Sequence, residues 1–467
     1  MFRKIKHMHF VGIGGIGMSG IAEVLLNLGY TVTGSDLKES PITERLSSLG
    51  AKVSTGHSPH NVKDADVVVY SSAVKPDNVE LVEAKSRQIP TIARAEMLAE
   101  LMRMKYGIAV AGTHGKTTTT SMIARILTEG GLDPTIVVGG KLRSLDTNAK
   151  LGAGEYLVCE ADESDRSFLK LSPTISVITT LEEEHMESYR DLETVEDAYV
   201  QFANKVPFYG CVVLSLDEKN LQNILARIEK RCITYGMKTQ VNVKAKGVVF
   251  EGFGSKYVLQ SNGDTLGEIR LGVPGLHNVY DSLAACAVGL ELGLDFSVLT
   301  RALAEFKGVR RRFEIKGEVD EVTLIDDYGH HPTEIEVTLE GARRAWPGRI
   351  IAVFQPHLYS RTARLADSFG RSFYNADLVV VTDVYGAREE PIRGVSGRLI
   401  SDACTASGHK AVNYVEDMAF VARWLLDIVR PGDMVLTMGA GDVYKVGEEL
   451  LKLLKARSEN SKARATS

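Results

Sequence analysis

The 467-residue sequence contains few cysteines, and its five cysteines form no C-x-x-C pair. Because their number is odd and they are scattered, the sequence favours reduced thiols over a disulfide framework. No apolar run is long enough to cross a bilayer, and the amino-terminal residues lead directly into a predicted strand without a signal-peptide core. We therefore expect a cytoplasmic protein that does not bind membranes.

Charge of either sign is not in large excess, since the formal net charge is −5. Without a basic excess, the sequence gives no indication of nucleic-acid binding. It contains no short-period repeat and no low-complexity segment, and it makes no prediction about oligomeric state. A chain of this length is too long for one hydrophobic core and suggests about three domains.

Strand and helix signals alternate along the chain, which is typical of α/β domains with parallel sheets. The pattern divides into residues 1–105, 106–313 and 314–467. Within the second segment, residues 241–274 carry short β-type runs between turn signals, so antiparallel hairpins are expected there. Residues 457–467 are polar and are predicted to form a disordered tail.

A glycine-rich loop follows the first predicted strand. Gly12, Gly14 and Gly17 satisfy the pattern G-x-G-x-x-G, and Asp36 lies about 20 residues further on, where an acid contacts a ribose hydroxyl. Such a loop holds a pyrophosphate at a helix amino terminus. Dinucleotides and UDP-sugars both offer these groups, so the loop predicts a diphosphate ligand, with a purely structural turn as the alternative.

Residues 111–119 read AGTHGKTTT, between an apolar strand and a helix-forming segment. Gly112 and Gly115 allow backbone N–H groups to turn toward an anion. Lys116 would bind nucleotide phosphates and Thr117 a magnesium ion. A valine replaces the first glycine of the longer G-x-x-x-x-G-K-[ST] pattern, which points away from the common GTPases. The alternative is an ordinary strand-turn-helix.

Polar residues follow the next strands of this middle segment. Glu160 ends a strand and opens the run EADESD, and strand ends that face a phosphate loop commonly supply magnesium carboxylates. We predict that Glu160 binds a metal, against the alternative of a solvated acidic loop. The other acids of this run carry a weaker signal. His185 lies among acids after a further strand and is a second candidate metal ligand.

Two polar segments close strands in the last third of the chain. Residues 326–332 read DDYGHHP, and residues 355–361 begin with Gln-Pro-His and end with an arginine. Both would reach the same edge of an open α/β sheet, where ligands bind. One arginine of residues 310–312 is expected to neutralise phosphate charge, with a solvated basic turn as the alternative.

Taken in order, these motifs resemble those of the Mur ligase family. The markers cover nearly the whole chain: VGIGGIGMS at 11–19, GTHGKTTT at 112–119, EADESD at 160–165, HN at 277–278, RRFE at 311–314, residues 326–335 and QPH at 355–357. The resemblance implies a Rossmann-like domain that binds a UDP-sugar (1–105). It further implies a central P-loop ATPase domain with a mostly parallel sheet plus hairpins (106–313). The third implied domain is Rossmann-like, binds the amino acid and closes over the site (314–467).

The resemblance also implies a reaction of peptidoglycan precursor synthesis. ATP phosphorylates the carboxylate of UDP-N-acetylmuramate, and L-alanine attacks the acyl phosphate to give an amide. Phosphorylation converts a poor acyl donor into a good one and needs charge neutralisation, for which two Mg²⁺ sites are implied. The alternative within the family is a muropeptide ligase that attaches a tripeptide to the same UDP-sugar.

Residue roles follow from the resemblance by position. The residues implied to bind ATP are Gly112, Thr113, His114, Gly115, Lys116, Thr117, Thr118, His277, Asn278 and Arg312. Those implied to bind metal are Thr117, Glu160 and His185. Those implied to bind the UDP-sugar are Gly14, Gly15, Ile16, Gly17 and Asp36. Those implied to surround the alanine are Tyr328, His330, His357 and Arg361. Those expected to be catalytic are Lys116, Arg312, Asp327 and His330.

Five positions depart from the family pattern. Thr180 stands where an asparagine is usual around the histidine, and Glu184 and Glu187 stand where the shorter aspartate is usual, so the geometry of the second metal site is expected to differ. Leu358 stands in place of an arginine after Gln-Pro-His, and Asp281 in place of an asparagine. We expect weaker or differently tuned binding of alanine.

Two other functional classes remain compatible with parts of the sequence. A nicotinamide-dependent oxidoreductase would use the first glycine loop but would leave Lys116 and Glu160 without a role. A nucleotide-driven switch would bind and hydrolyse ATP regardless of a UDP-sugar or an amino acid.

Overall fold

The fold is described from a computed structural model. The structure describes residues 5–71, 73–142, 147–184, 186, 188–238, 240–387 and 389–465. Unit 1 comprises Met1–Gly247, Tyr257–Ile269 and Tyr280–Phe306, and unit 2 comprises Val248–Lys256, Arg270–Val279 and Lys307–Ser467. The fold is α/β throughout, as predicted, whereas the domain boundaries that the sequence suggests stay a prediction.

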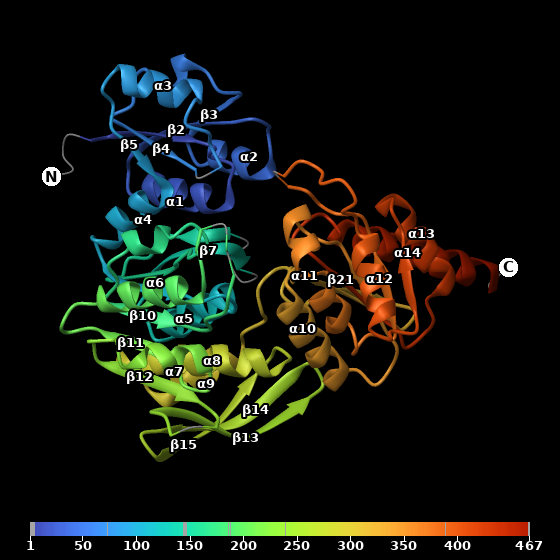
Figure 1. Ribbon diagram of the computed structural model, residues 1–467. Helices are drawn as coiled ribbons and strands as arrows, with labels where there is room; N and C mark the ends of the chain where they lie inside the picture. Colours follow the sequence, from blue (N-terminus) through green and yellow to red (C-terminus); the bar gives the residue numbers. More distant parts are fainter. Residues whose placement is uncertain are drawn as a thin grey trace. The chain divides into compact units, whose positions relative to one another are not determined.

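Unit 1 begins with a five-stranded parallel sheet of order β3-β2-β1-β4-β5 (Figure 1). Its strands are β1 (His7–Val11), β2 (Thr31–Asp36), β3 (Lys52–Thr55), β4 (Val67–Tyr70) and β5 (Thr91–Ala93). Its helices are α1 (Ile16–Asn27), α2 (Pro41–Ser48), α3 (Val79–Ser86) and α4 (Arg94–Met102), with a 3₁₀ turn at Pro59–Val62. Because β1 pairs with both β2 and β4, the loop after β1 opens at the point where the strand order reverses, the usual ligand crevice of such sheets.

The second sheet has ten strands in the order β15-β14-β13-β12-β11-β10-β6-β9-β7-β8. The strands are β6 (Tyr106–Ala111), β7 (Thr135–Leu142), β8 (Thr147–Lys150), β9 (Tyr156–Glu160), β10 (Ile175–Ile178), β11 (Cys211–Ser215), β12 (Cys232–Gly236), β13 (Val243–Glu251), β14 (Gly254–Ser261) and β15 (Asp264–Leu271). The helices are α5 (Lys116–Glu129), α6 (Leu192–Asn204), α7 (Lys219–Leu225), α8 (Leu276–Glu291) and α9 (Phe296–Ala304), with a 3₁₀ turn at Ser167–Lys170.

The expected hairpins lie at one edge of this sheet. Two-residue turns connect β13 to β14 and β14 to β15, and strands joined this tightly run antiparallel. In the second turn, Asn262 and Gly263 have φ angles of 50° and 97°. Two successive positive φ angles at Asn-Gly are the backbone of the hairpin turn that the sequence predicts.

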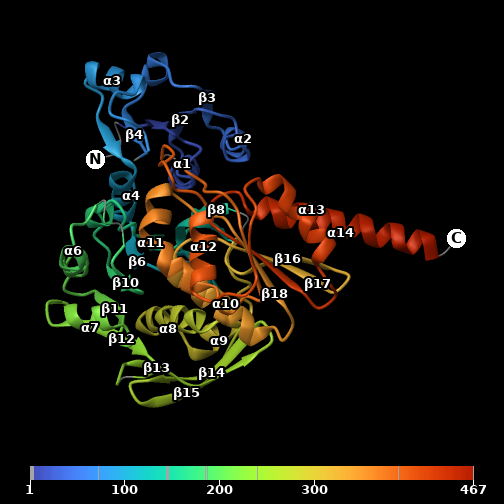
Figure 2. The same cartoon turned by 45° about the vertical axis from the view of Figure 1, so that its right-hand side comes forward.

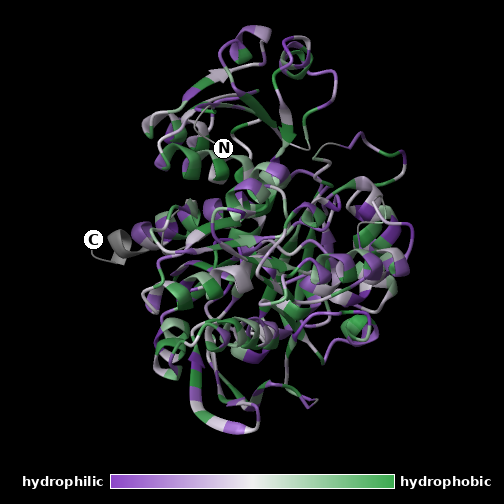
Figure 3. Cartoon of the chain, turned by 90° about the vertical axis from the view of Figure 1, so that its left-hand side faces the viewer, coloured by the Kyte–Doolittle hydropathy of each residue, from purple (hydrophilic) through white to green (hydrophobic). Residues whose placement is uncertain are grey.

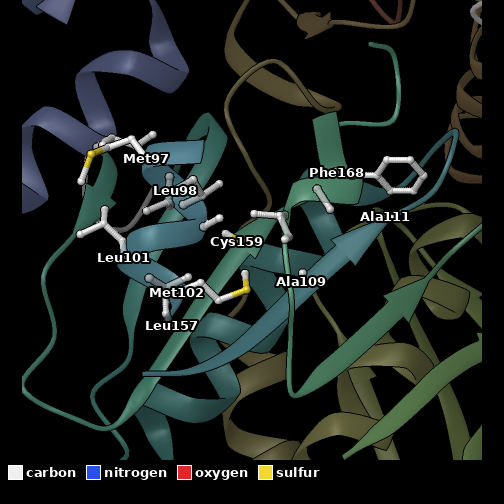
Figure 4. Packing of buried hydrophobic residues seen from close by; sticks show 14 of the residues in the cluster. Met97, Leu98, Leu101, Met102, Ala109, Ala111, Leu157, Cys159 and Phe168 are labelled. Atoms are coloured by element: carbon white, nitrogen blue, oxygen red, sulfur yellow. The ribbon is translucent and has the colours of Figure 1, made fainter. Parts of the chain in front are cut away.

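One hydrophobic cluster runs through unit 1, from the first sheet to the second. Figure 4 shows how α4 contributes to it: its side chains pack with those of β6 and β9. The labelled members are Met97, Leu98, Leu101, Met102, Ala109, Ala111, Leu157, Cys159 and Phe168. The approach is close, because a Cβ added at Gly107 would lie 2.4 Å from Cγ of Met102. This shared core accounts for the grouping of the first sheet and the phosphate-loop sheet in one compact unit.

Unit 2 contains a six-stranded sheet of order β16-β17-β21-β18-β19-β20, parallel except where β16 meets β17. The strands are β16 (Glu314–Val319), β17 (Val322–Asp327), β18 (Ile350–Phe354), β19 (Leu378–Val381), β20 (Val412–Tyr414) and β21 (Met434–Met438). The helices are α10 (Pro332–Ala345), α11 (Tyr359–Ser372), α12 (Arg398–Ala406), α13 (Met418–Ile428) and α14 (Tyr444–Ala465). In Figures 1 and 2, α11 lies beside α12 and α13 beside α14.

The helices of both units carry hydrophobic and hydrophilic residues along their length, as the colours of Figure 3 show. Among the described residues, no helix combines the length and hydrophobicity that a membrane span requires. Helix α14 continues to Ala465, so much of the predicted disordered tail is helical. Ala, Lys, Arg and Glu dominate this segment, and their intrinsic helix propensities are high.

Candidate nucleotide and substrate sites

The glycine loop after β1 is held by the end of β2. The N–H groups of Gly12 and Ile13 donate to the Ser35 carbonyl at 2.9 and 3.0 Å, and the N–H of Gly14 donates to Oδ2 of Asp36 at 2.8 Å. Oδ1 of Asp36 accepts a second backbone N–H, from the next residue, at 2.8 Å. Asp36 therefore fixes the loop in this structure, and its predicted contact with a ribose stays a prediction.

The start of α1 is shaped for an anion. Gly15 is the N-cap, and because glycine has no side chain, no N-cap side chain bonds to the first turn of α1, whose amino terminus carries a partial positive charge. A Cβ at Gly14 would lie 2.9 Å from Oδ2 of Asp36, and one at Gly17 would lie 3.1 Å from Cδ of Arg94. The predicted residues of this loop, with Ile16 at the first helical position, are thus brought together.

The phosphate loop follows β6 in unit 1, and both of its glycines are required. Gly112 has φ 140°, and an added Cβ would lie 1.9 Å from Oγ1 of Thr179. Gly115, with φ 82°, is the N-cap of α5, and an added Cβ would lie 2.5 Å from Oδ1 of Asp281. As in α1, no side chain caps the first turn of α5. The loop therefore presents a helix amino terminus with Lys116 and Thr117 in its first turn.

Residues that follow β10 form hydrogen bonds with the phosphate loop. The N–H of Thr113 donates to the Thr180 carbonyl at 3.1 Å, and the N–H of His114 donates to Oγ1 of Thr180 at 2.9 Å. Nε2 of His114 lies 3.5 Å from Oε2 of Glu182. Thr180, one of the departures, thus stabilises the loop through its hydroxyl. Glu184 is buried, whereas the predicted ligand His185 and the departure Glu187 lie outside the described residues.

Lys116 folds back onto its own loop. Its Nζ donates to the carbonyls of Gly112 and Thr113 at 2.5 and 3.1 Å and to Oε1 of Glu163 at 2.7 Å. Burial alone would lower the pKa of Lys116, but the carboxylates of Glu163, Asp162 and Glu160 together outweigh it, with Glu163 contributing most, and the net shift is upward. The lysine is therefore a cation at neutral pH.

Glu160 occupies the edge of the sheet where the phosphate loop begins. It ends β9, and its register partner is Val110 on β6. On the other side of β6, Ile178 of β10 pairs with Ala111. Carboxylate and hydroxyl oxygens are donors that Mg²⁺ accepts, so Glu160 at the end of β9 and Thr117 in the first turn of α5 fit a magnesium site by their chemistry.

The end of β17 supplies a buried acid in unit 2. Asp327 is 4% exposed; Oδ2 accepts the N–H of Phe313 at 2.8 Å and Oδ1 that of Gly329 at 2.7 Å. Burial raises the pKa of Asp327 to about 6, against the opposing effect of Arg312. The Arg312 guanidinium lies 5.4 Å from the ring of Tyr328. A carboxyl with this pKa can exchange a proton near neutral pH.

Four predicted residues of unit 2 form one aromatic and basic group. The His330 ring lies 5.3 Å from that of Tyr328 and 5.5 Å from that of His357. Tyr385 stacks on His357 with ring centroids 6.0 Å apart. Burial lowers the pKa of His330 to about 3, with Arg361 acting in the same direction. His330 is thus a neutral imidazole, and the group offers one fixed cation, Arg361.

The start of α8 carries the predicted His277 and Asn278. Nδ2 of Asn278 donates to the Pro274 carbonyl at 2.5 Å and lies 3.0 Å from Nε2 of His277. Burial lowers the pKa of His277 to about 4, and Arg312 adds to this shift. Among the described residues, Nδ1 of His277 is a buried atom without a hydrogen-bond partner. A buried polar atom of this kind suits a contact with a ligand.

The sequence missed several contacts of these sites. Glu163, which binds Lys116, belongs to the acidic run that gave only a weak signal. Glu334 lies 3.4 Å from Nη1 of Arg312. It is the third residue of α10, three after the N-cap His331, and a glutamate at this position is the second half of a capping-box signal. No sequence signal identifies Tyr385, whose position depends on how β19 pairs with β18.

Three family models match the chain in sequence order. Residues 7–106 match "Mur ligase family, catalytic domain", residues 110–289 match "Mur ligase middle domain", and residues 311–441 match "Mur ligase, glutamate ligase domain". Together these matches cover most of the chain.

Curated relatives resemble the chain over nearly its full length. A UDP-N-acetylmuramate–L-alanine ligase of Geotalea uraniireducens is 54% identical over 97% of this chain and 99% of its own. One from Geobacter sulfurreducens is 54% identical over 98% of this chain and 100% of its own. Among solved structures, the UDP-N-acetylmuramate-alanine ligase of Thermotoga maritima matches with a TM-score of 0.82 and 31% identity, over 97% of this chain and 99% of that one.

Proposed function

The chain belongs to the Mur ligase family, and we propose that it is an ATP-dependent ligase that forms an amide between the carboxylate of UDP-N-acetylmuramate and L-alanine. The observation that carries this proposal is the 54% identity, over 97% of the chain, to a ligase of that name. The phosphate loop and the buried acid of β17 supply the chemistry that such a reaction needs.

ATP is proposed to bind at the phosphate loop, with the uncapped start of α5 and Lys116 facing its phosphates. By position in the family pattern, His277, Asn278 and Arg312 are proposed as further nucleotide ligands. Thr117 and Glu160 would hold Mg²⁺, with His185 proposed for a second ion. A bound Mg²⁺ supplies charge neutralisation while the carboxylate oxygen of the sugar attacks the terminal phosphorus and ADP leaves.

The UDP moiety is proposed to bind at the glycine loop of the first sheet. Its diphosphate would lie at the amino terminus of α1, beside Gly15, Ile16 and Gly17. Asp36 already fixes this loop through two backbone N–H groups. Asp36 therefore supports the binding residues whether or not it also contacts the ribose.

The amino acid is proposed to bind at Tyr328, His330, His357 and Arg361. The guanidinium of Arg361 is the cation of this group and would bind the alanine carboxylate. The alanine amine must lose a proton to attack the acyl phosphate. Of the four catalytic candidates, Lys116 and Arg312 are cations, so the proton acceptor is one of the other two: His330 has a pKa of about 3 and Asp327 one of about 6. The carboxylate is therefore the stronger base, and we assign proton acceptance to Asp327.

Omission of each substrate in turn tests the function. Phosphate release from ATP should require both UDP-N-acetylmuramate and L-alanine, and Lys116→Ala should abolish it. When the sugar carboxylate carries ¹⁸O, one labelled oxygen should appear in the released phosphate, because that oxygen stays on phosphorus when the acyl phosphate is cleaved. Phosphate without label would exclude the acyl-phosphate route.

The same assay separates the alternatives. A muropeptide ligase would release phosphate with the tripeptide L-alanyl-γ-D-glutamyl-meso-diaminopimelate and not with L-alanine. A nucleotide-driven switch would release phosphate without either substrate, and an oxidoreductase would bind NADH at the glycine loop.

The proposal places the protein in the cytoplasm. All five cysteines are free thiols in the structure, and four of them are buried. This pattern is typical of proteins from a reducing compartment.

A further inference from the structure

The side-chain ammonium of Lys116 uses its full donor capacity within the protein itself. An ammonium group has three N–H donors, and Nζ of Lys116 has three acceptors: two loop carbonyls and Oε1 of Glu163. To bind a phosphate oxygen, Lys116 must therefore release at least one of these acceptors. Of the three acceptors, only the Glu163 carboxylate is an anion, so a phosphate that replaces it leaves the ammonium paired with a negative charge.

The Glu163 carboxylate is held in place by its own loop. Its side chain is 4% exposed, and its backbone carbonyl accepts the Tyr189 hydroxyl at 2.6 Å and the N–H of Arg166 at 3.0 Å. Arg166 adopts a positive φ of 62°, which turns the chain sharply after Glu163. The carboxylate thus faces Lys116 because the loop is fixed.

The neighbouring acid has other partners. Oδ1 of Asp162 accepts the N–H and the hydroxyl of Ser164 at 3.1 and 2.7 Å, and Oδ2 lies 3.3 Å from Nη2 of Arg94. Asp165 is exposed and accepts the N–H of Ser167 at 2.9 Å. Glu163 is therefore the carboxylate of this loop that bonds directly to the phosphate-loop lysine.

We propose that Glu163 is a latch residue, which is the counter-ion of Lys116 in the nucleotide-free protein and is displaced when nucleotide phosphate binds. The Glu163 carboxylate neutralises the buried ammonium of Lys116 while that ammonium bonds to the carbonyls of the phosphate loop. It therefore competes with the nucleotide phosphates for Lys116. This competition makes Glu163 a positioning residue that sets nucleotide affinity. The inference rests on the proposed function only in that the displacing anion is a nucleotide phosphate.

Metal-free ADP is the probe that isolates the latch, because any effect through Mg²⁺ is then absent. In EDTA, calorimetric titration should show that Glu163→Gln binds ADP about tenfold more tightly than the wild type, which corresponds to about 1.4 kcal/mol. The matched control Asp165→Asn removes the same charge from the same loop without touching Lys116. It should bind ADP within about twofold of the wild type, since exposed charges are well screened.

Thermal unfolding without nucleotide provides the second readout. Glu163→Gln should lower the melting temperature, because Lys116 loses its counter-ion while buried, and Asp165→Asn should leave it unchanged. A merely structural role for Glu163 would lower stability without tightening ADP binding. Should Glu163→Gln fail to fold, Glu163→Asp, whose shorter side chain weakens the contact, should tighten ADP binding about threefold, by the same competition.

Three results would overturn the latch. The first is unchanged or weaker binding of ADP by Glu163→Gln, and the second is an equal tightening by Asp165→Asn. The third is a loss of affinity in Glu163→Gln that is seen with Mg·ADP and not with metal-free ADP. The last of these would make Glu163 a metal ligand. If the wild type and both variants fail to bind ADP with Mg²⁺ as well as in EDTA, the proposed function fails. A wild type that binds metal-free ADP as tightly as Glu163→Gln overturns only the latch.

Discussion

Oγ1 of Thr119 donates a hydrogen bond to Oδ1 of Asp281 at 2.9 Å, and this same oxygen would lie 2.5 Å from a Cβ placed on Gly115. The contact fixes the Asp281 carboxylate directly behind the residue that caps α5. A side chain at position 115 must therefore push the phosphate loop away from α8, which carries Asp281.

Gly115→Ala should reduce ATP-dependent phosphate release by at least about 100-fold, because a small displacement of the phosphate loop misplaces the reacting groups. Gly131→Ala is the matched control. Gly131 lies just beyond the other end of α5 with a similar φ of 76°, but an added Cβ would meet nothing within 4 Å. The Gly131→Ala substitution adds only backbone strain, which lowers stability by about 1 kcal/mol, and should keep activity within about twofold.

The pKa of Asp327 predicts the acid limb of the pH profile. With a pKa of about 6, this carboxyl is protonated below pH 6 and ionised above it, so it accepts a proton only on the alkaline side. In the wild type, kcat/KM for L-alanine should fall about tenfold per pH unit below pH 6. Asp327→Asn should lower kcat about 10²- to 10⁴-fold and remove this limb.

Asp326→Asn provides the comparison for Asp327. Asp326 is also buried, but its oxygens accept the Thr437 hydroxyl at 2.7 Å and Nε of Arg311 at 3.0 Å. Its replacement should lower stability and leave the acid limb in place. An acid limb that persists in Asp327→Asn would assign the limb to another group.

The fold could be predicted in large part because its signals are local. Apolar strands followed by helical segments specify a parallel sheet, and Asn262-Gly263 specifies a tight hairpin turn. The carboxyl ends of neighbouring parallel strands must meet at one edge, so the register of Glu160 beside Val110 follows from topology alone. The last two turns of α14 were predicted to be disordered because the polarity of residues 457–467 was weighed over their helix propensity.

The site could be predicted only where a residue's role depends on its own motif. The bond between Lys116 and Glu163 joins residues 47 positions apart, and it depends on the backbone turn at Arg166. The low pKa of His330 depends on burial, which no local pattern reports. Asp36 stands where the glycine-loop motif places an acid, but the motif does not report that its carboxylate accepts backbone N–H groups of the loop.

A buried network around Glu80 stabilises the first sheet. Glu80, on α3, is fully buried; its carboxylate accepts the Ser35 hydroxyl at 2.6 Å, Nδ2 of Asn61 at 2.5 Å and the N–H of Ser58 at 3.1 Å, and it lies 3.3 Å from Nε2 of His9. Burial alone would raise the pKa of Glu80, but these hydrogen bonds lower it to about 2. The ionised form is therefore the one that the folded state favours.

The sign of the pH effect follows from this downward shift. The contribution of Glu80 to stability is fully present above its ordinary pKa of 4.5 and is lost as the pH falls toward 2. Glu80→Gln should reduce the free energy of unfolding by about 2–3 kcal/mol at pH 7. In urea denaturation, the difference from the wild type should shrink steadily below pH 4.5.

Glu83→Gln on the same helix is the control for Glu80. Glu83 lies 2.5 Å from Nε of Arg87, and both side chains are partly exposed. An ion pair of this kind contributes less than about 0.5 kcal/mol. A loss of equal size in the two variants would show that the network around Glu80 adds nothing beyond an ordinary surface pair.

Leu358 allows a test of amino-acid binding. Its N–H donates to the Tyr385 carbonyl at 3.0 Å, and it adopts a φ of 68° between His357 and α11. Leu358→Arg keeps the same backbone conformation but places a second guanidinium beside the group that we propose for alanine. Because a charged hydrogen bond to a carboxylate contributes about 1.5–3 kcal/mol, KM for L-alanine should fall at least about tenfold while KM for ATP stays unchanged.

Leu358→Gln separates charge from side-chain length at this position. Its uncharged amide should leave KM for L-alanine within about threefold of the wild type, since a neutral hydrogen bond contributes about 1 kcal/mol or less. Equal values for the wild type and Leu358→Arg would mean that the alanine carboxylate is bound elsewhere. Arg361 would then lose its proposed role as well, because both side chains belong to the segment that follows β18.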